Sequence, residues 1–224
     1  MDQTIAVSKE RSEVFAQGLC FYKLALIFII GSFVGTLYEE IGHFLHRGFY
    51  ESRSGVMFGP FNPIYGIGYV LMLLVLSRVR NLGLSVLVGA FVGGGFEYLA
   101  SAGQEFFTGH LSWNYEGQFM NINGRTTVLY SLYWGLLGTF LVRGVYPILS
   151  NLVERMPPHT GKIVTRALIV FILINMLISY GALLRQHMRH LEMEPYTVVG
   201  EFFDHYYPDS RIYEAFPDME RLEE

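Results

Sequence analysis

The sequence predicts an all-α fold, a polytopic membrane bundle of about five transmembrane helices. Hydrophobic residues make up 51% of the 224 residues and charged residues only 16%, against about a quarter charged in soluble domains. The apolar residues gather in long runs with little charge, whereas much of the charge lies near the C-terminus. Because a bilayer cannot hydrogen-bond an open backbone, helices are the economical way for such runs to cross it.

Five apolar segments are the candidate spans. They cover residues 21–45, 64–77, 81–103, 126–149 and 167–184. Pro60 and Pro63 restrict the second helix to 64–77, because proline breaks the helical hydrogen-bond ladder. A soluble protein with buried core helices is the alternative, but five such runs exceed what a small core can bury.

The distribution of charge predicts three parts of the chain. Residues 1–20 form a polar N-terminal segment, 21–184 the transmembrane domain, and 185–224 an acidic soluble tail that holds ten of the twenty acidic and four of the sixteen basic residues. Aromatic residues within the tail allow short helices that rest on the bundle, but we favour a solvated appendage. Such charge does not suit a nucleic-acid partner, and a single cysteine, Cys20, excludes an intrachain disulfide.

The basic residues predict an orientation in the cell membrane. If the N-terminus is cytoplasmic, the inner segments hold nine of the sixteen Lys and Arg residues and the outer segments hold seven. The inner group is Lys9, Arg11, Lys23, Arg78, Arg80, Arg143, Arg155, Lys162 and Arg166. Cytoplasmic loops usually carry the excess of basic residues, so we expect the N-terminus inside.

Two spans repeat one pattern of small residues followed by a carboxylate. The first is Gly31, Gly35 and Glu39, and the second is Gly89, Gly93 and Glu97. Residues four apart share a helical face over a few turns, and glycine lets another backbone approach closely. Since carboxylates are costly at membrane depth, Glu39 and Glu97 are candidate functional residues. The alternative is that the glycines only pack helices and the acids lie among the headgroups.

The same pattern suggests an internal repeat. A shift of 58 residues moves the first group onto the second and also moves Gly66 onto Gly124. The first and third spans should point the same way, so this would be a parallel repeat of a kind found in some transporters.

A polar and aromatic segment, residues 106–125, follows the third span. Trp113 suits a membrane interface, and Asn121 and Asn123 have the chemistry of a tight turn. Arg125 begins the fourth span and could reach Glu39, Glu97 or Glu105, because a buried guanidinium needs such a partner. Alternatively, the segment is an interfacial hairpin whose arginine contacts lipid phosphate.

The uncharged stretch GPFNPIYGIG, residues 59–68, contains two prolines and three glycines. Irregular backbone at membrane depth is tolerated only where protein or water covers it. We therefore expect this Gly/Pro-rich loop to fold back into the bundle, against the helices of Glu39 and Glu97 and the turn at 121–125, and to help enclose a polar pocket. The alternative is a simple loop on the end of the bundle.

Together these motifs resemble a bacterial family of multi-pass membrane proteins, the ABC-transporter type IV permeases. The resemblance covers roughly residues 25–150 and rests on GxxxE at 35–39, GPxxPIYGxG at 59–68, EY at 97–98, WxY at 113–115, NxNGR at 121–125 and SLxWG at 131–135. Asn114 departs from the family's usual aspartate, and two positions, Arg47 and Arg53, fit its Arg-Gly-Phe element.

The resemblance implies the permease subunit of a transporter, with a buried polar pocket on the substrate path. The predicted pocket residues are Glu39, Asn62, Tyr65, Glu97, Tyr98, Glu105, Trp113, Asn121, Asn123 and Arg125. The chain has no GxxxxGK[ST] phosphate loop, so a separate ATPase subunit would be needed. The expected partners are the lipid bilayer, a small molecule or lipid not identified by the sequence, and further subunits in a homo- or hetero-oligomer. No cofactor is expected.

Two other classes of function remain open. A membrane-embedded enzyme could use the same pocket, and Glu40 and His43 have the i, i+3 spacing of carboxylate-bridged metal sites. Only one copy of that pair exists and HExxH is absent, so we expect no metal site and lean against an enzyme. The third class is a lipid-binding or assembly protein in which the pocket holds the bundle together.

Overall fold

The computed structural model describes residues 14–217 and 219–221. Within them, four helices are long and apolar enough to cross a membrane: α1 (Phe21–Arg47), α3 (Leu82–Thr108), the continuous segment Val128–Glu154, and α6 (Pro158–His190). A shorter apolar helix, α2 (Pro63–Leu76), accompanies them. The all-α membrane bundle predicted from the sequence is therefore confirmed, with one helix shorter than a full span.

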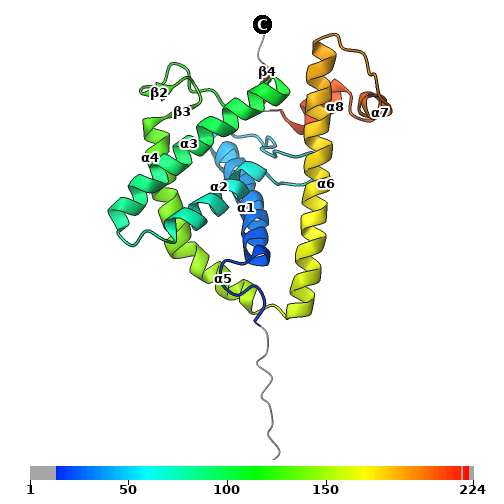
Figure 1. Cartoon of the computed structure of the whole chain (residues 1–224). Helices are drawn as coiled ribbons and strands as arrows, with labels where there is room; N and C mark the ends of the chain where they lie inside the picture. The colour runs from blue at the N-terminus through cyan, green and yellow to red at the C-terminus, as the bar shows by residue number, and fades with distance from the viewer. Residues whose placement is uncertain (1–13, 218, 222–224) are drawn as a thin grey trace, which may run out of the picture.

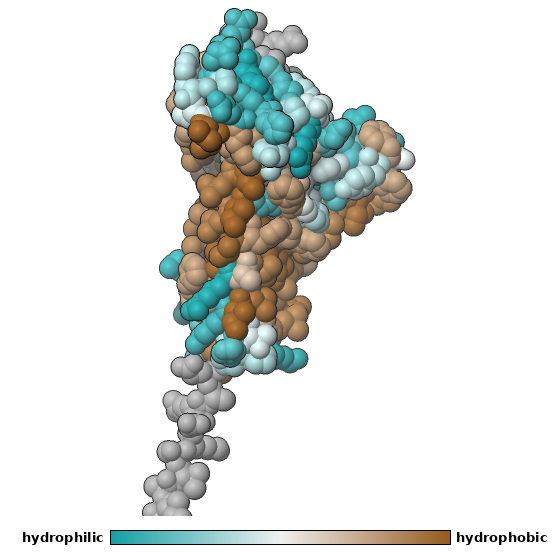
Figure 2. All heavy atoms as spheres, turned by 90° about the vertical axis from the view of Figure 1, so that its right-hand side faces the viewer, coloured by the Kyte–Doolittle hydropathy of each residue, from teal (hydrophilic) through white to brown (hydrophobic). Residues whose placement is uncertain are grey.

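Successive helices alternate in direction (Figure 1). α1, α3 and α6 rise in this view, whereas α2 and the segment Val128–Glu154 descend. We call the upper end, which contains residues 109–127 and 191–217, the hairpin end. We call the lower end, which contains residues 14–25, 76–81 and 140–168, the basic end. Figure 2 shows a hydrophobic band between two hydrophilic ends, as expected for a bilayer-spanning protein.

α2 lies at the centre of the bundle. Asn62 begins the helix by accepting a hydrogen bond from the Ile64 amide at 3.1 Å, and Pro63 occupies the first helical position. Fourteen residues reach only about 21 Å, short of a bilayer core of about 30 Å. The main apolar core surrounds the helix and joins it to α1 and to the fourth span; its buried residues are Ile27, Tyr69, Met72, Leu73, Leu76 and Val142.

The fourth span contains a π-helical turn. α4 (Val128–Phe140) continues through η1 (Leu141–Val145) into α5 (Tyr146–Glu154). Pro147 stands at the beginning of α5 and has no amide hydrogen to give to the preceding turn. Such a bulge lets the helix continue past a proline without breaking the span.

Short strand pairs close the hairpin end. β1 (His110–Leu111) pairs antiparallel with β4 (Glu220–Arg221), and β2 (Asn121–Ile122) pairs antiparallel with β3 (Thr126–Thr127). In the second pair Ile122 faces Thr126. The turn between them uses Gly124 at a φ of +68°, in the left-handed region that glycine enters without strain.

The C-terminal tail packs on the bundle, so the solvated appendage that we favoured is wrong. α7 (Val198–Tyr206) and α8 (Asp209–Ala215) lie against the upper part of α6 (Figure 1). The tail residues Tyr207, Ile212 and Phe216 form a buried cluster with Ala182 and Leu183 of α6. The aromatic residues of the tail supply the apolar surface that holds it there, despite its net negative charge.

Candidate functional site

Glycines set the positions of the two intramembrane carboxylates. A side chain at Gly35 would overlap the ring of Tyr65 on α2, and one at Gly93 would overlap Trp134 on α4. Gly89 lies against the backbone of Gly135 in the same helix pair. The small-residue positions therefore pack α1 on α2 and α3 on α4. In each pair the carboxylate lies one helical turn after the glycine that contacts the aromatic ring.

The helix pairs do not continue the 58-residue repeat. Gly66 packs against Phe28 and Ser32 of α1, as expected for a helix contact. Gly124, its counterpart under the shift, lies in the turn between β2 and β3 and not in a helix. The likeness between the two halves is thus limited to α1, α3 and the aromatic side chain that packs against the glycines of each.

Glu97 is the most enclosed carboxylate of the predicted set, with a residue exposure of 6%. The Tyr115 hydroxyl donates to its Oε1 at 2.9 Å, and the Thr126 hydroxyl donates to its Oε2 at 2.6 Å. Both donors are neutral and both come from the segment between α3 and α4. The indole nitrogen of Trp134 is buried nearby and makes no hydrogen bond of standard geometry. Glu97 is thus bound by hydroxyl groups and not by a cation.

Glu39 adjoins this group from the other helix pair. It accepts a hydrogen bond from the Tyr65 hydroxyl, and it is half-buried. The rings of Tyr65 on α2 and Trp134 on α4 have centroids 6.5 Å apart, so an aromatic contact joins the two helix pairs. The Tyr38 hydroxyl of α1 and the Tyr133 hydroxyl of α4 share a hydrogen bond at 3.1 Å, a second contact between the two helix pairs.

Arg125 pairs with Glu105, one of its three predicted partners. Its Nη2 donates to Glu105 Oε2, its Nη1 donates to Ser101 Oγ at 3.3 Å, and its guanidinium lies 5.9 Å from the ring centroid of Tyr98. The same face of α3 thus presents Glu97 to neutral hydroxyls and, two turns later, Glu105 to the arginine.

The turn residues hold the hairpin together. The Asn121 side chain accepts from the Gly124 amide at 3.0 Å, and the Asn123 amide donates to the Tyr98 hydroxyl at 3.0 Å. The Trp113 indole donates to the carbonyl of Arg125 at 2.9 Å. These contacts fix the backbone next to Thr126. They therefore position the Thr126 hydroxyl, which donates to Glu97, without contacting Glu97 themselves.

The Gly/Pro-rich loop packs against a helix that sequence reasoning did not assign to it. Asn175 of α6 accepts from the Phe58 amide at 3.2 Å and donates to the Phe58 carbonyl at 2.6 Å. Ser179 accepts from the Met57 amide at 2.8 Å. These anchors hold the two residues just before the loop on α6, and not at the 121–125 turn. Within the loop, the Asn62 amide donates to the Ser32 carbonyl of α1 at 3.0 Å, so the predicted contact with the helix of Glu39 is present. Asn175 stands near the middle of α6 and is 1% exposed, so the irregular backbone is covered by protein.

Glu40 and His43 do not share a ligand site. Glu40 accepts from the Tyr50 hydroxyl and the Arg53 amide, each at 3.3 Å, whereas His43 lies 3.3 Å from Glu51. In the part of the chain that the structure describes, no three His, Cys, Asp or Glu side chains gather as metal ligands would. Burial, followed by the charge and hydrogen bond of Glu40, raises the pKa of Tyr50.

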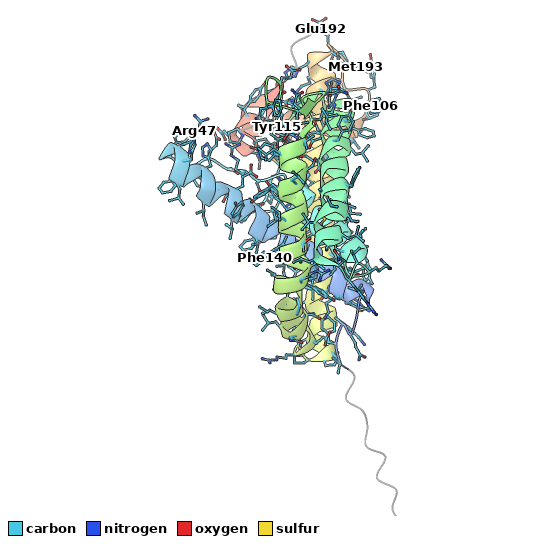
Figure 3. The ribbon with its side chains drawn as sticks, turned by 90° about the vertical axis from the view of Figure 1, so that its left-hand side faces the viewer. Arg47, Phe106, Tyr115, Phe140, Glu192 and Met193 are labelled. Atoms are coloured by element: carbon cyan, nitrogen blue, oxygen red, sulfur yellow. The ribbon has the colours of Figure 1, made fainter. Side chains whose placement is uncertain are left out.

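Burial and the Glu97 carboxylate also act on Tyr115, which lies at the upper end of α4 (Figure 3). Its ring stacks on Tyr130 with centroids 4.7 Å apart. Burial first, and then the charge of Glu97 and the hydrogen bond to it, raise the pKa of Tyr115 well above its ordinary value. Tyr115 therefore remains a hydrogen-bond donor to Glu97 at all physiological pH values.

Sequence reasoning missed several residues that complete the site. Trp134 and Tyr115 stood in the motifs but not among the predicted pocket residues, and Thr126, Asn175 and Ser179 were not singled out. Asn175 did carry a signal, because it is an uncharged polar residue inside the most apolar run. Thr126 carried none, since a threonine at the start of a helix is ordinary.

A bundle of apolar spans with carboxylates enclosed between its helices defines an integral, multi-pass membrane protein. The family model described as Putative ABC-transporter type IV matches residues 26–180, and the chain belongs to that family. The resemblance seen in the motifs is thereby confirmed and extends further along the chain. Neither a curated protein nor a solved structure matches the chain.

Proposed function

We propose that this chain is the membrane-spanning subunit of an ABC-type transporter and that Glu97 lies on its substrate path. The observation that supports this most strongly is the placing of Glu97. It stands just past the middle of α3, it is buried, and its hydrogen-bond partners are neutral. An ionisable group at such a depth is costly, and structural packing alone would not require it.

The surroundings of Glu97 suit a group that exchanges partners. Tyr115 lies in a loop and Thr126 lies in the short strand β3, so neither donor comes from the rigid middle of a helix. The nearby Trp134 indole is a further donor that makes no hydrogen bond of standard geometry in the described conformation. Movement of the hairpin would therefore free the carboxylate to bind a proton or the donor group of a substrate. In the described conformation the side chains close the site on one another.

The energy source would be a separate ATPase subunit, because this chain has no phosphate-binding loop. We place that subunit at the basic end and the N-terminus in the cytoplasm, where basic residues are normally in excess. The remaining predicted pocket residues, from Asn62 to Arg125, would shape the site and hold the hairpin.

The test is purification of the tagged chain from its native membranes, identification of any co-purifying ATPase, and measurement of ATP turnover in lipid nanodiscs. Glu97→Gln should lower turnover at least tenfold while the melting temperature and the amount of bound ATPase stay unchanged. Glu116→Gln is the matched control, because Glu116 is an exposed carboxylate of the same hairpin.

Unchanged turnover in Glu97→Gln would remove Glu97 from the transport path. A parallel loss of turnover and of thermal stability would favour the assembly role, in which the carboxylate only holds the hairpin. Isolation of the chain with lipid and without any ATPase would contradict the transporter assignment.

A further inference from the structure

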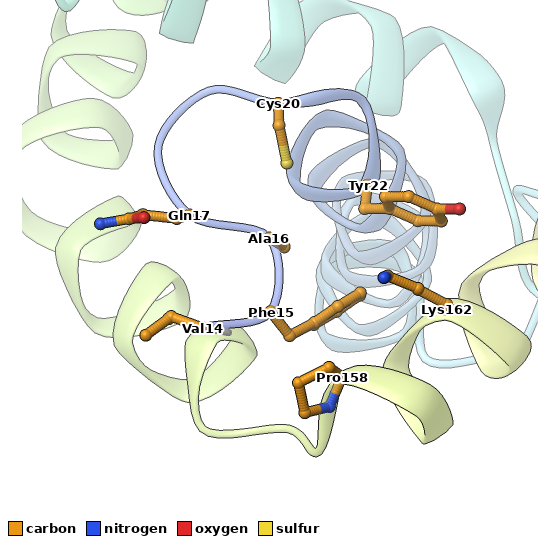
Figure 4. Close-up of a pocket in the computed structure, with 8 residues that line it drawn as sticks. All are labelled: Val14, Phe15, Ala16, Gln17, Cys20, Tyr22, Pro158 and Lys162. Atoms are coloured by element: carbon orange, nitrogen blue, oxygen red, sulfur yellow. The ribbon is translucent and has the colours of Figure 1, made fainter. Parts of the chain in front are cut away.

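Two aromatic side chains, one from the segment before α1 and one from the tail, pack on glycines of α6. At the basic end, a side chain at Gly161 would overlap the ring of Phe15, which is 2% exposed and lies beside Pro158 (Figure 4). At the hairpin end, a side chain at Gly181 would overlap the ring of Phe203, which belongs to α7. Phe15 is covered by protein, whereas the apolar residues beside Phe203 on α7 are largely exposed.

The nine residues of α7 form one apolar and one polar face. At about 100° per residue, the apolar side chains fall within an arc of about 140°, and the acidic residues and the histidine fall on the other side. Phe203 turns its part of the arc toward α6, while the other four apolar side chains are between 43% and 81% exposed. We call these four the outer face of α7: Val198, Val199, Phe202 and Tyr206.

The contacts of α7 fix its height along α6. Gly181, which Phe203 contacts, lies in the last turn of the apolar run 167–184. One turn further on, Arg185 donates to Asp204 from Nε at 2.9 Å and from Nη2 at 2.8 Å. Arg185 is the first charged residue after the apolar run. α7 therefore lies at the level where the hydrocarbon core of a bilayer meets the headgroups.

The outer face of α7 adjoins the lipid-facing surface of α6. Gly181 is four residues from Leu177 and three from Leu184, so all three lie on one face of α6. Both leucines are exposed, as expected for side chains that meet lipid. Figure 1 shows α7 beside the upper part of α6, on the side away from the rest of the bundle. The apolar surface of the span thus continues onto α7.

We propose that α7 is an interfacial helix whose outer face is buried in the bilayer, among the headgroups and upper acyl carbons at the hairpin end. Amphipathic helices with an apolar face of this kind lie in the plane of the interface. The tail exposes the carboxylates of Glu192, Glu194 and Glu201, which anionic lipids would repel. The lipid surface that fits α7 is therefore zwitterionic, and apolar burial supplies the binding free energy.

The test compares two labelled positions on opposite sides of α7 in the full chain, in nanodiscs of phosphatidylcholine. Val199→Cys and Glu201→Cys are each labelled with a nitrobenzoxadiazole fluorophore in a Cys20→Ser background. Phosphatidylcholine with a doxyl quencher near the headgroup end of the acyl chain should quench the label at Val199 about threefold more strongly than the label at Glu201. Leu184→Cys, at the same height on α6, is the reference for a position in contact with lipid.

Three results of the quenching experiment would overturn the proposal. Equal quenching at Val199 and Glu201 would show that α7 presents no particular face to the bilayer. A label at Val199 that is not quenched, or that crosslinks to a second copy of the chain, would show that water or protein covers the outer face. Stronger quenching when phosphatidylglycerol replaces part of the phosphatidylcholine would show attraction to anionic lipid, against the charge of the tail.

A second variant separates membrane contact from the packing of the tail on α6. Val198→Ser/Val199→Ser removes apolar surface that the rest of the protein leaves exposed, so the α7 amides should exchange about tenfold faster in nanodiscs. The amides of α8 are the internal control, because Ile212 and Phe216 hold that helix in a buried cluster. Unchanged exchange in α7, or an equal rise in α7 and α8, would contradict the proposal.

Discussion

Glu97 and Glu105 lie two turns apart on one face of α3, yet their surroundings differ. Glu105 is partly exposed near the end of the helix and is paired with Arg125. Glu97 is buried near the middle of the helix and is held by the hydroxyls of Tyr115 and Thr126. The Arg125 guanidinium thus pairs with the outer carboxylate, where the free-energy cost of burying a charge is lower.

The difference separates two kinds of role. An ion pair near the membrane surface stabilises a hairpin and needs no further explanation. A buried carboxyl among neutral donors contributes less to stability than an apolar core residue would, and so its presence calls for a functional reason. The predictions below test whether these two roles can be separated by mutation.

The largest effect is expected from Glu97→Ala. This change leaves the Tyr115 and Thr126 hydroxyls buried without an acceptor, at a cost of about 2–5 kcal/mol. Glu97→Gln keeps an acceptor for Tyr115 and should cost less than about 1 kcal/mol. Thermal unfolding of both variants in the same detergent measures the difference. Equal losses would show that the charge itself, and not the hydrogen bonds, holds the site.

A smaller effect is expected at the outer pair. Arg125→Gln should destabilise the chain by about 1 kcal/mol, because the pair is partly exposed and screened by salt. The double variant Arg125→Gln/Glu105→Gln should recover part of that loss. A double-mutant cycle at low and high salt measures the coupling. A coupling that salt does not reduce would mean that the pair is more deeply buried than the structure indicates.

The docking of the tail should depend on acid pH. Hydrogen bonds from Arg185, with the largest effect, and from Arg189 hold the pKa of Asp204 below its ordinary value of 3.8, and burial opposes them. The stabilisation is therefore fully present above that ordinary value and is lost as the pH falls through the lowered pKa. The protection of the α7 amides against hydrogen exchange, relative to the intrinsic rate at each pH, should therefore fall sharply below about pH 4.

Asp204→Asn supplies the control for that titration. The variant should show faster exchange in α7 at neutral pH and a flatter dependence on acid. A wild-type profile that stays flat down to pH 2 would mean that the apolar cluster around Ile212 and Phe216 holds the tail without help from the ion pairs.

The smallest effect is spectroscopic. The raised pKa of Tyr115 keeps it protonated in alkali that ionises exposed tyrosines. Glu97→Gln removes a neighbouring negative charge but leaves the burial, so it should lower that pKa in part, and Tyr115 should ionise at a lower pH than in the wild-type chain in an ultraviolet titration. Tyr115→Phe should abolish the difference. If the two profiles coincide in the Glu97→Gln variant, Tyr115 is not bound to Glu97 in solution.

Much of the fold could be predicted because it follows from local properties of the chain. The apolar runs predicted the helices, and the glycines at 35 and 93 predicted close contacts that Tyr65 and Trp134 now fill. The tail was misjudged because net charge was weighed above its aromatic residues, which meet α6 only after folding. The extent of α6 beyond residue 184 was missed for a related reason, since Arg185 becomes tolerable there once Asp204 pairs with it.

The candidate site was harder to predict, because spacing identifies the residues of one helix face but not their partners on another. Glu39 and Glu97 were found from their spacing, and Arg125 was given three possible partners of which Glu105 is the observed one. The hydrogen bonds between Asn175 and Phe58, the residue just before the Gly/Pro-rich loop, join residues 117 apart in the chain. No local pattern contains such a contact, so only the folded arrangement reveals it.

The most direct test of the central claim is complementation of a gene deletion in the native host by two variants at equal membrane levels. Glu105→Gln should restore growth or substrate uptake almost as well as the wild-type chain. Glu97→Gln should fail to restore it although the protein is present and folded. Full activity of Glu97→Gln, or equal failure of both variants, would contradict the assignment of the functional role to the buried carboxyl.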